Sequence, residues 1–200
     1  VQTDDGNSVN ETDETDNRAS YGPVVVGQPN LALSDVVVPA TLITGRSNEI
    51  SWTVTNTSSV PVTVDWIDRV YLSSDDQIGD DLELGSIHRP FGLDPAEQYV
   101  SEEAVSMPGM AAGNYWVIIK ADGWNWIGES TEDDNTIITG PVTVTGPDLT
   151  VASVQAPTDI YVGEAISIDW SIENIGGAEA LGDWDDTIYL SDDDQVGDDQ

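Results

Sequence analysis

The sequence contains no cysteine, so no disulfide holds the chain together, and its stability must come from packing or from bound ions. Basic residues are scarce: 5 Lys and Arg stand against 38 Asp and Glu, which gives a formal net charge of −33. A surface this acidic excludes nucleic acid as a natural partner and argues against docking on anionic membranes. Apolar runs near the ~20 residues that a membrane helix needs are also missing. The chain starts at Val1 without a signal peptide, which predicts a processed or partial chain.

The composition is nevertheless that of a folded protein. Hydrophobic residues make up 38% of the chain, and most of its seven Trp lie in alternating patterns. A disordered chain with this charge would carry far fewer apolar residues. Because so many carboxylates repel one another, something must neutralise them. Divalent cations and high salt are the two candidates.

An internal repeat organises the sequence. Pro29-Asn30-Leu31 returns 118 residues later as Pro147-Asp148-Leu149. At the same offset and without a gap, residues 50–56 (ISWTVTN) match 168–174, and residues 65–81 (DWIDRVYLSSDDQIGDD) match 183–199. The offset also holds upstream, where Asp4, Glu11, Asp16 and Asn17 fall on Asp122, Glu129, Asp134 and Asn135.

These registers divide the chain into three parts. Residues 1–28 are expected to be the C-terminal end of a preceding repeat, residues 29–146 a complete repeat, and residues 147–200 the N-terminal half of the next. A half-domain cannot bury its own apolar face. We therefore expect that the chain continues or that another subunit completes the half-domain.

The complete repeat has the pattern of an all-β protein. Helical periodicity is absent, whereas short alternating segments bounded by Gly and Pro turns are frequent. Trp52, Trp66 and Tyr71 recur at the 118-residue offset and are interpreted as packing residues. About seven strands at such intervals are typical of an immunoglobulin-like β-sandwich, here in tandem. The expected strands are 31–38, 48–56, 60–64, 68–73, 97–107, 114–121 and 135–144. In residues 48–56 the alternation predicts that Ile50, Trp52 and Val54 face inward, and the apolar run 114–121 is expected to be buried on both faces or nearly so.

Four motifs in a fixed order resemble the CARDB family, the cell-adhesion-related domain found in bacteria. They are the opening Pro29 to Leu31, the strand 51–56, the W-x-D-x-V-Y-L-S-x-D segment 66–75, and the closing E-x-x-E-x-[DN]-N segment 129–135. The resemblance covers nearly the whole chain. It implies a seven-stranded immunoglobulin-like sandwich, a place in large surface or secreted proteins, and no enzymatic activity.

The first candidate site is an acidic loop. Carboxylates surround Gly79, and Ca²⁺ takes six to eight oxygen ligands from such groups. The alternative is a solvated acidic hairpin loop that serves solubility in salt. Repetition favours a Ca²⁺ site, because the acids recur while neighbouring positions drift. The predicted ligands are Asp68, Asp75, Asp76, Asp80 and Asp81, with the repeat copy Asp186, Asp193, Asp194, Asp198 and Asp199.

A second acidic cluster lies near the end of the complete repeat, where a cation would stiffen the junction with the next one. The alternative, which we prefer, is that Asn135 and Glu132 cap backbone groups before the last strand. The cluster comprises Asp122, Glu129, Glu132, Asp134 and Asn135.

Two tryptophans form the third candidate. Trp124 and Trp126 flank an Asn, and exposed indoles stack on sugar rings, but local packing is the more common role for such a pair. Catalysis has little support, because His88 is the only histidine and no Cys or obvious Ser partner accompanies it.

These observations predict a non-catalytic structural or adhesive repeat of an extracellular or cell-surface protein, stiffened by Ca²⁺. Its partners are neighbouring repeats of the same protein, with self-assembly or a cell-surface or polysaccharide ligand in addition. The alternatives are an accessory polysaccharide-binding module of a secreted enzyme and a halophile surface repeat without specific ion sites. Monovalent salt alone would stabilise the last of these.

Overall fold

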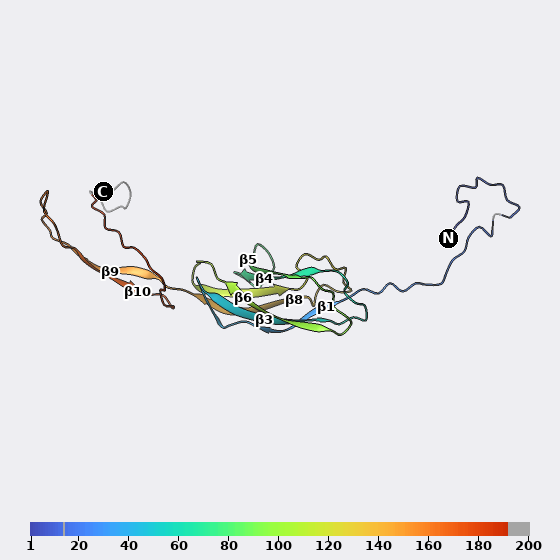
Figure 1. The fold of residues 1–200 in the computed structure, drawn as a ribbon, viewed down its shortest axis with the longest axis horizontal. Coiled ribbons are helices and arrows are strands. Elements are labelled where there is room, and N and C mark those ends of the chain that lie inside the picture. Colours follow the sequence, from blue (N-terminus) through green and yellow to red (C-terminus); the bar gives the residue numbers. More distant parts are fainter. Residues whose placement is uncertain (14, 192–200) are drawn as a thin grey trace.

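The computed structural model describes residues 1–13 and 15–191. Its main body is a sandwich of two β-sheets (Figure 1). One sheet has the order β1-β3-β6, and the other has the order β2-β8-β7-β4-β5. All neighbouring pairs are antiparallel except β2 and β8, which run parallel. The strands are β1 Leu31–Val37, β2 Thr41–Ile43, β3 Ser47–Asn56, β4 Trp66–Ser73, β5 Leu82–Arg89, β6 Gln98–Ser106, β7 Gly113–Lys120 and β8 Thr136–Thr145.

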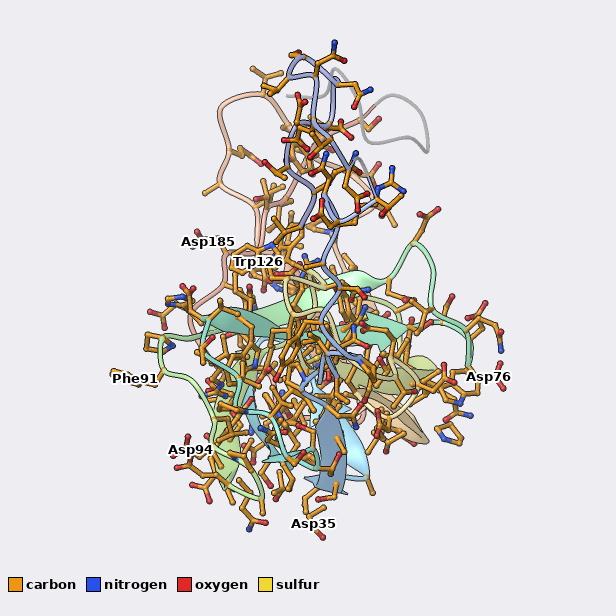
Figure 2. The ribbon with its side chains drawn as sticks, turned by 90° about the vertical axis from the view of Figure 1, so that its right-hand side faces the viewer. Asp35, Asp76, Phe91, Asp94, Trp126 and Asp185 are labelled. Carbon is orange, nitrogen blue, oxygen red and sulfur yellow. The ribbon has the colours of Figure 1, made fainter. Side chains whose placement is uncertain are left out.

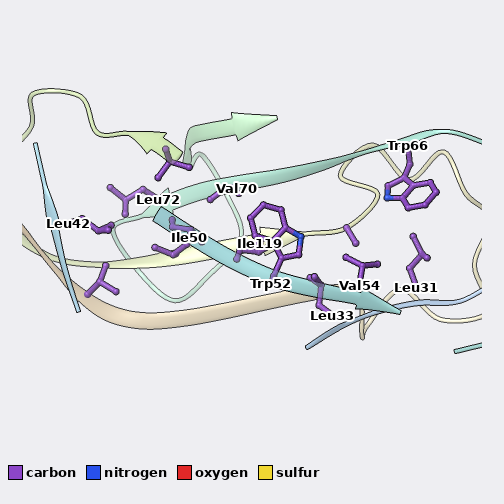
Figure 3. Packing of buried hydrophobic residues seen from close by; sticks show 14 of the residues in the cluster. Leu31, Leu33, Leu42, Ile50, Trp52, Val54, Trp66, Val70, Leu72 and Ile119 are labelled. Atoms are coloured by element: carbon purple, nitrogen blue, oxygen red, sulfur yellow. The ribbon is translucent and has the colours of Figure 1, made fainter. Parts of the chain in front are cut away.

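Alternation along the strands builds the core between the two sheets. On β3, Ile50, Trp52 and Val54 point inward and are fully buried, as the sequence predicts. Val70 from β4 and Ile119 from β7 meet them from the other sheet (Figure 3). Because successive strand side chains alternate between faces, this single pattern fixes which face of each strand is inside.

The prediction that residues 114–121 are buried on both faces is also confirmed. Val117 and Ile119 join the core, while Ile118 is buried on the outer face of the same sheet. Strand β7 lies between β8 and β4, so backbone groups on both of its edges are paired.

Two details of the strand prediction are wrong. Residues 60–64 form no strand and contribute only an isolated bridge between Val62 and Leu93, because Pro61 has no N–H to donate to a ladder. Strands β2 and β5 were not expected. The first has three residues, and the second is an edge strand with exposed Leu82 and a central Gly85, so neither carries a strong alternating signal.

Segments on both sides of the sandwich match parts of it in sequence. Residues 1–3 pair with residues 17–19 in antiparallel fashion through a bridge between Gln2 and Arg18, the counterparts of the paired Lys120 and Thr136. On the other side lies a two-stranded sheet (Figure 1). Its strands, β9 Leu149–Gln155 and β10 Asp169–Asn174, stand 118 residues after β1 and the second part of β3.

The C-terminal copy keeps its apolar residues exposed. Trp170 is 43% exposed, whereas its counterpart Trp52 is fully buried. In the part of the chain that the structure describes, no helix is long and apolar enough to cross a membrane.

Candidate functional site

In the acidic loop after β4, the carboxylates of Asp75, Asp76 and Asp81 accept hydrogen bonds from other groups of the same loop. Asp75 Oδ1 accepts a hydrogen bond from Gln77 N at 2.9 Å, and Asp81 Oδ2 accepts one from Gly79 N at 2.9 Å. Asp76 accepts from the Gln77 side chain at 2.8 Å and lies at the tip of the loop (Figure 2). The contact between Asp75 and the Gln77 N–H is an Asx turn, a common way to shape a short polar loop.

Asp68 does not belong to this loop, which corrects the predicted ligand set. It lies inside the sandwich with no exposed surface. Its Oδ1 accepts from Trp66 Nε1 at 3.0 Å, and its Oδ2 accepts from Arg89 Nε at 3.0 Å and from the Tyr99 hydroxyl. Because Tyr99 belongs to β6 and Arg89 to β5, this carboxylate ties the two sheets together.

The partners of Asp68 also contact one another. The Arg89 guanidinium lies 4.6 Å from the Tyr99 ring centroid, and the Trp66 and Tyr99 rings are 6.1 Å apart. Burial raises the pKa of Tyr99, and the neighbouring Asp68 charge acts in the same direction. Both effects favour the protonated phenol, which is the form that donates a hydrogen bond to Asp68.

In the second cluster, Asp122 caps a tight turn. It is fully buried, and its two carboxylate oxygens accept from Trp126 N at 2.9 Å and Ile127 N at 2.7 Å. Its own φ of 47° is in the left-handed region, which Asp tolerates better than most residues. The carboxylate is thus occupied by two backbone donors.

Glu129 and Asn135 join this loop to the start of the domain. Glu129 Oε2 accepts from the Leu31 amide, and Oε1 accepts from Asn135 Nδ2 at 3.0 Å. The same Asn135 nitrogen donates to Glu132 at 3.0 Å, so it separates two carboxylates. Burial raises the pKa of Glu129 to about 7, and Glu132 and Asp122 add to this against the hydrogen bonds from Leu31 and Asn135.

Asp134 completes the network by accepting from Asn30 Nδ2 at 2.8 Å. The contacts to Asn30 and Leu31 place the cluster where the chain enters the sandwich. The expected position at the junction with the next repeat is therefore wrong, because the linker after β8 leaves from the opposite end (Figure 1). The capping residues were wrongly predicted: among the described contacts, the side chains of Asn135 and Glu132 bond only to other side chains, and Asp122 and Glu129 accept from the backbone instead.

Within residues 1–13 and 15–191, no three Asp, Glu or His side chains are grouped so that they could hold a metal ion. Of the predicted repeat copy, Asp186 is described and accepts from Trp170 Nε1 at 2.8 Å. The remaining members, Asp193, Asp194, Asp198 and Asp199, lie outside the described residues.

The third candidate lies on the loop that Asp122 caps. Trp124 and Trp126 are 52% and 55% exposed. The Arg69 guanidinium lies 4.5 Å from the Trp124 ring centroid. Trp126 lies well away from the acidic tip at Asp76 (Figure 2), so the two candidate sites are separate.

No family model matches the chain, and no curated protein matches it. Among solved structures, a CARDB domain from Pyrococcus furiosus, solved in complex with di-metal ions, is 19% identical with a TM-score of 0.46. The match covers 63% of this chain and 99% of that domain. The fold is similar to that of CARDB domains.

Two further structures resemble the chain. A domain of a putative cell surface protein from Methanosarcina acetivorans is 17% identical with a TM-score of 0.45, and the match covers 58% of this chain and 94% of that domain. A β-glucosidase from Listeria innocua is 17% identical with a TM-score of 0.39, but only 16% of the enzyme is covered. The all-β sandwich expected from the sequence is present in the two sheets of the structure, and CARDB domains are among the solved structures with a similar fold.

Proposed function

We propose that this chain is a non-catalytic structural or adhesive repeat of a large extracellular or cell-surface protein. The observation that carries the proposal is the use of its buried acids. Asp68, Asp122 and Glu129 each accept two or more hydrogen bonds from groups of the same domain. A carboxylate occupied in this way builds the scaffold and is not available to a substrate.

The N-terminal segment supports a scaffold role, because it repeats the capped turn. Asp4 accepts from Ser8 N at 2.7 Å and from Val9 N at 2.8 Å, at the positions that match the donors to Asp122. A loop that recurs with the repeat belongs to its architecture rather than to a single active site.

The proposed partners are neighbouring repeats, joined closely. Only residues 146–148 separate β8 from β9. Glu179 approaches Arg46 of the sandwich at 3.8 Å, and a Cβ on Gly177 would come within 2.3 Å of Thr145 Oγ1. Such a short connection, with contacts between the sandwich and the following segment, favours a stiff joint over a flexible tether.

The joint can be tested by spin labelling the 200-residue chain, which has no native cysteine. The pair Ser86→Cys and Ala152→Cys places one label on β5 and one on β9, and Ser86→Cys with Glu102→Cys is a reference pair within the sandwich. A stiff joint gives an inter-repeat distance distribution nearly as narrow as the reference. A distribution as broad as that of a flexible linker would refute the close coupling.

The proposal also includes Ca²⁺, which would bind at exposed acids and stiffen the repeat. An adhesive role would then depend on the surface that the stiffened array of repeats exposes. The exposed loop acids Asp76 and Asp80, together with the net charge of −33, are the support for Ca²⁺ binding. A site with a Kd of ~50 μM would add about 2.7 kcal/mol to the free energy of unfolding at 5 mM Ca²⁺.

Thermal unfolding in EDTA, in 5 mM Ca²⁺ and in NaCl of matched ionic strength measures this contribution. A rise in melting temperature with Ca²⁺ alone, lost in Asp76→Asn with Asp80→Asn, supports a specific site. An equal rise in NaCl contradicts it and assigns the acids to a solvation coat of the kind that a high-salt habitat favours.

A further inference from the structure

The loop that bears Trp124 and Trp126 forms without them in the N-terminal copy. Their counterparts there are Gly6 and Ser8, yet Asp4 makes the same two backbone hydrogen bonds as Asp122. The left-handed residues also coincide: Asn7 has a φ of 52° and Asn125 has a φ of 52°. The two indoles are therefore additions to a loop whose backbone does not depend on them.

Two neighbouring positions differ together with the indoles. Arg69 has Thr187 as its counterpart, and Gly123 has Asp5. A Cβ at position 123 would lie 2.5 Å from both Cγ and Cδ of Arg69, so glycine makes room for the arginine stem. Arg69, Gly123 and Trp124 thus form one unit that the available copies of the repeat lack.

This unit holds an indole in a fixed place at the surface. The Arg69 guanidinium lies 4.5 Å from the Trp124 ring centroid and 5.1 Å from the Tyr71 ring centroid. Glu83 on β5 pairs with Arg69 and so restrains the guanidinium. A ring held by a cation over one face loses little conformational freedom when a ligand covers the other.

We propose that Trp124, Trp126 and Arg69 form a platform that binds a neutral polysaccharide. Indoles more than half exposed offer flat apolar surface to the C–H face of a hexose ring, and Asn125 and Glu83 supply polar groups beside it. Arg69 pairs with the Glu83 carboxylate, which neutralises its charge, and Lys120 donates to the Asn125 side-chain oxygen at 2.6 Å.

Charge decides between classes of glycan. The net charge of −33 repels polyanions such as uronic acid polymers, whereas a neutral chain pays no such penalty.

The N-terminal copy supplies a matched control for the test. The variant Arg69→Thr, Gly123→Asp, Trp124→Gly and Trp126→Ser installs the residues of the other copies and keeps the Asp122 cap. Trp126→Ala is a milder second variant, because the hydrogen bond to Asp122 comes from the backbone nitrogen. Trp184→Ala removes an indole of similar exposure in another part of the chain. Melting temperatures verify that each variant is folded.

Binding is measured by affinity gel electrophoresis of the 200-residue chain in laminarin, hydroxyethylcellulose and galactomannan, with alginate as the polyanion. We expect at least one neutral polymer to retard the native chain and Trp184→Ala, and the loop variant to lose at least about tenfold in affinity. Retardation by none of the three, equal retardation of the loop variant, or equal retardation in alginate would overturn the proposal. The spin-label test of the joint is independent of this result.

Discussion

Replacement of Asp68 by Asn tests whether this acid is a structural link rather than a metal ligand. The side chain is fully buried and accepts three hydrogen bonds, from Trp66, Arg89 and Tyr99. An amide has one acceptor oxygen, so at least one donor loses its partner, and Arg89 loses its opposite charge. An unsatisfied buried donor costs about 1–3 kcal/mol, and removal of one partner from a buried pair costs about 3–5 kcal/mol.

The Arg89 side chain is 21% exposed and has Glu103 4.0 Å away, which lowers the charge penalty. We therefore expect Asp68→Asn to reduce the free energy of unfolding by about 3 kcal/mol. Urea denaturation of the 200-residue chain at constant ionic strength, followed by tryptophan fluorescence, measures this difference as a shift in the midpoint at unchanged slope.

Asp65→Asn is the matched control, because Asp65 pairs with His88 at 2.8 Å while both side chains are 54% exposed. We expect this variant to leave the urea midpoint unchanged within error, since exposed pairs contribute little. Added salt should not change the Asp68→Asn deficit, because buried charges are poorly screened. The reasoning fails if Asp68→Asn and Asp65→Asn have the same midpoint, or if the Asp68→Asn deficit appears only in the presence of Ca²⁺.

Three further predictions concern the loop between β7 and β8, residues 121–135, where the chain enters the sandwich. Because burial raises the folded-state pKa of Glu129 to about 7 from the usual 4.5, the folded state binds more protons, and the stability due to this group is full below pH 4.5 and is lost as pH rises through 7. As the pH rises from 4.5 through 7, the urea midpoint of the native chain should therefore fall relative to that of Glu129→Gln. Parallel curves of urea midpoint against pH for the two proteins would contradict this prediction. Asn135→Ala removes the nitrogen between Glu129 and Glu132 and should cost about 2 kcal/mol, measured by urea denaturation, with Glu132→Gln in the same background recovering part of the loss. Gly123→Ala should destabilise the domain by about 1–2 kcal/mol through its contact with Arg69, and the addition of Arg69→Thr should recover most of it; additive losses in thermal melts would show that the contact does not matter.

Much of the fold could be predicted from local pattern. Alternation in residues 48–56 identified β3 and its buried face, and the apolar run at 114–121 identified the doubly covered β7. Both signals lie within one segment and reflect the two-residue period of a strand. Strand β2 could not be found in this way, because three residues carry no period and its pairing with β8 joins positions about a hundred residues apart.

The acidic sites were harder to predict, for a physical reason. An acid that recurs at the 118-residue offset is expected both in a buried hydrogen-bond network and in a metal site. Repetition alone therefore does not distinguish the two roles. What separates Asp68 from Asp75 is the presence of Tyr99 and Arg89 on other strands, which sequence spacing does not reveal. For Glu129 the deciding partner is Leu31, 98 residues away. The spacing E-x-x-E-x-D-N indicated a shared cluster but not which backbone groups it caps.

The positions at which the chain enters and leaves the sandwich bear on how the repeat would respond to tension. The chain enters beside Asn30 and leaves after Thr145 at the opposite end (Figure 1). A pull along the chain therefore acts parallel to the short ladder between Thr41–Ile43 and Thr143–Thr145 and loads its hydrogen bonds together instead of opening them one after another. The three parallel residue pairs between β2 and β8, next to the point where the chain leaves the sandwich, would thus be the first element to bear mechanical load. An array of such repeats under tension would unfold one repeat at a time.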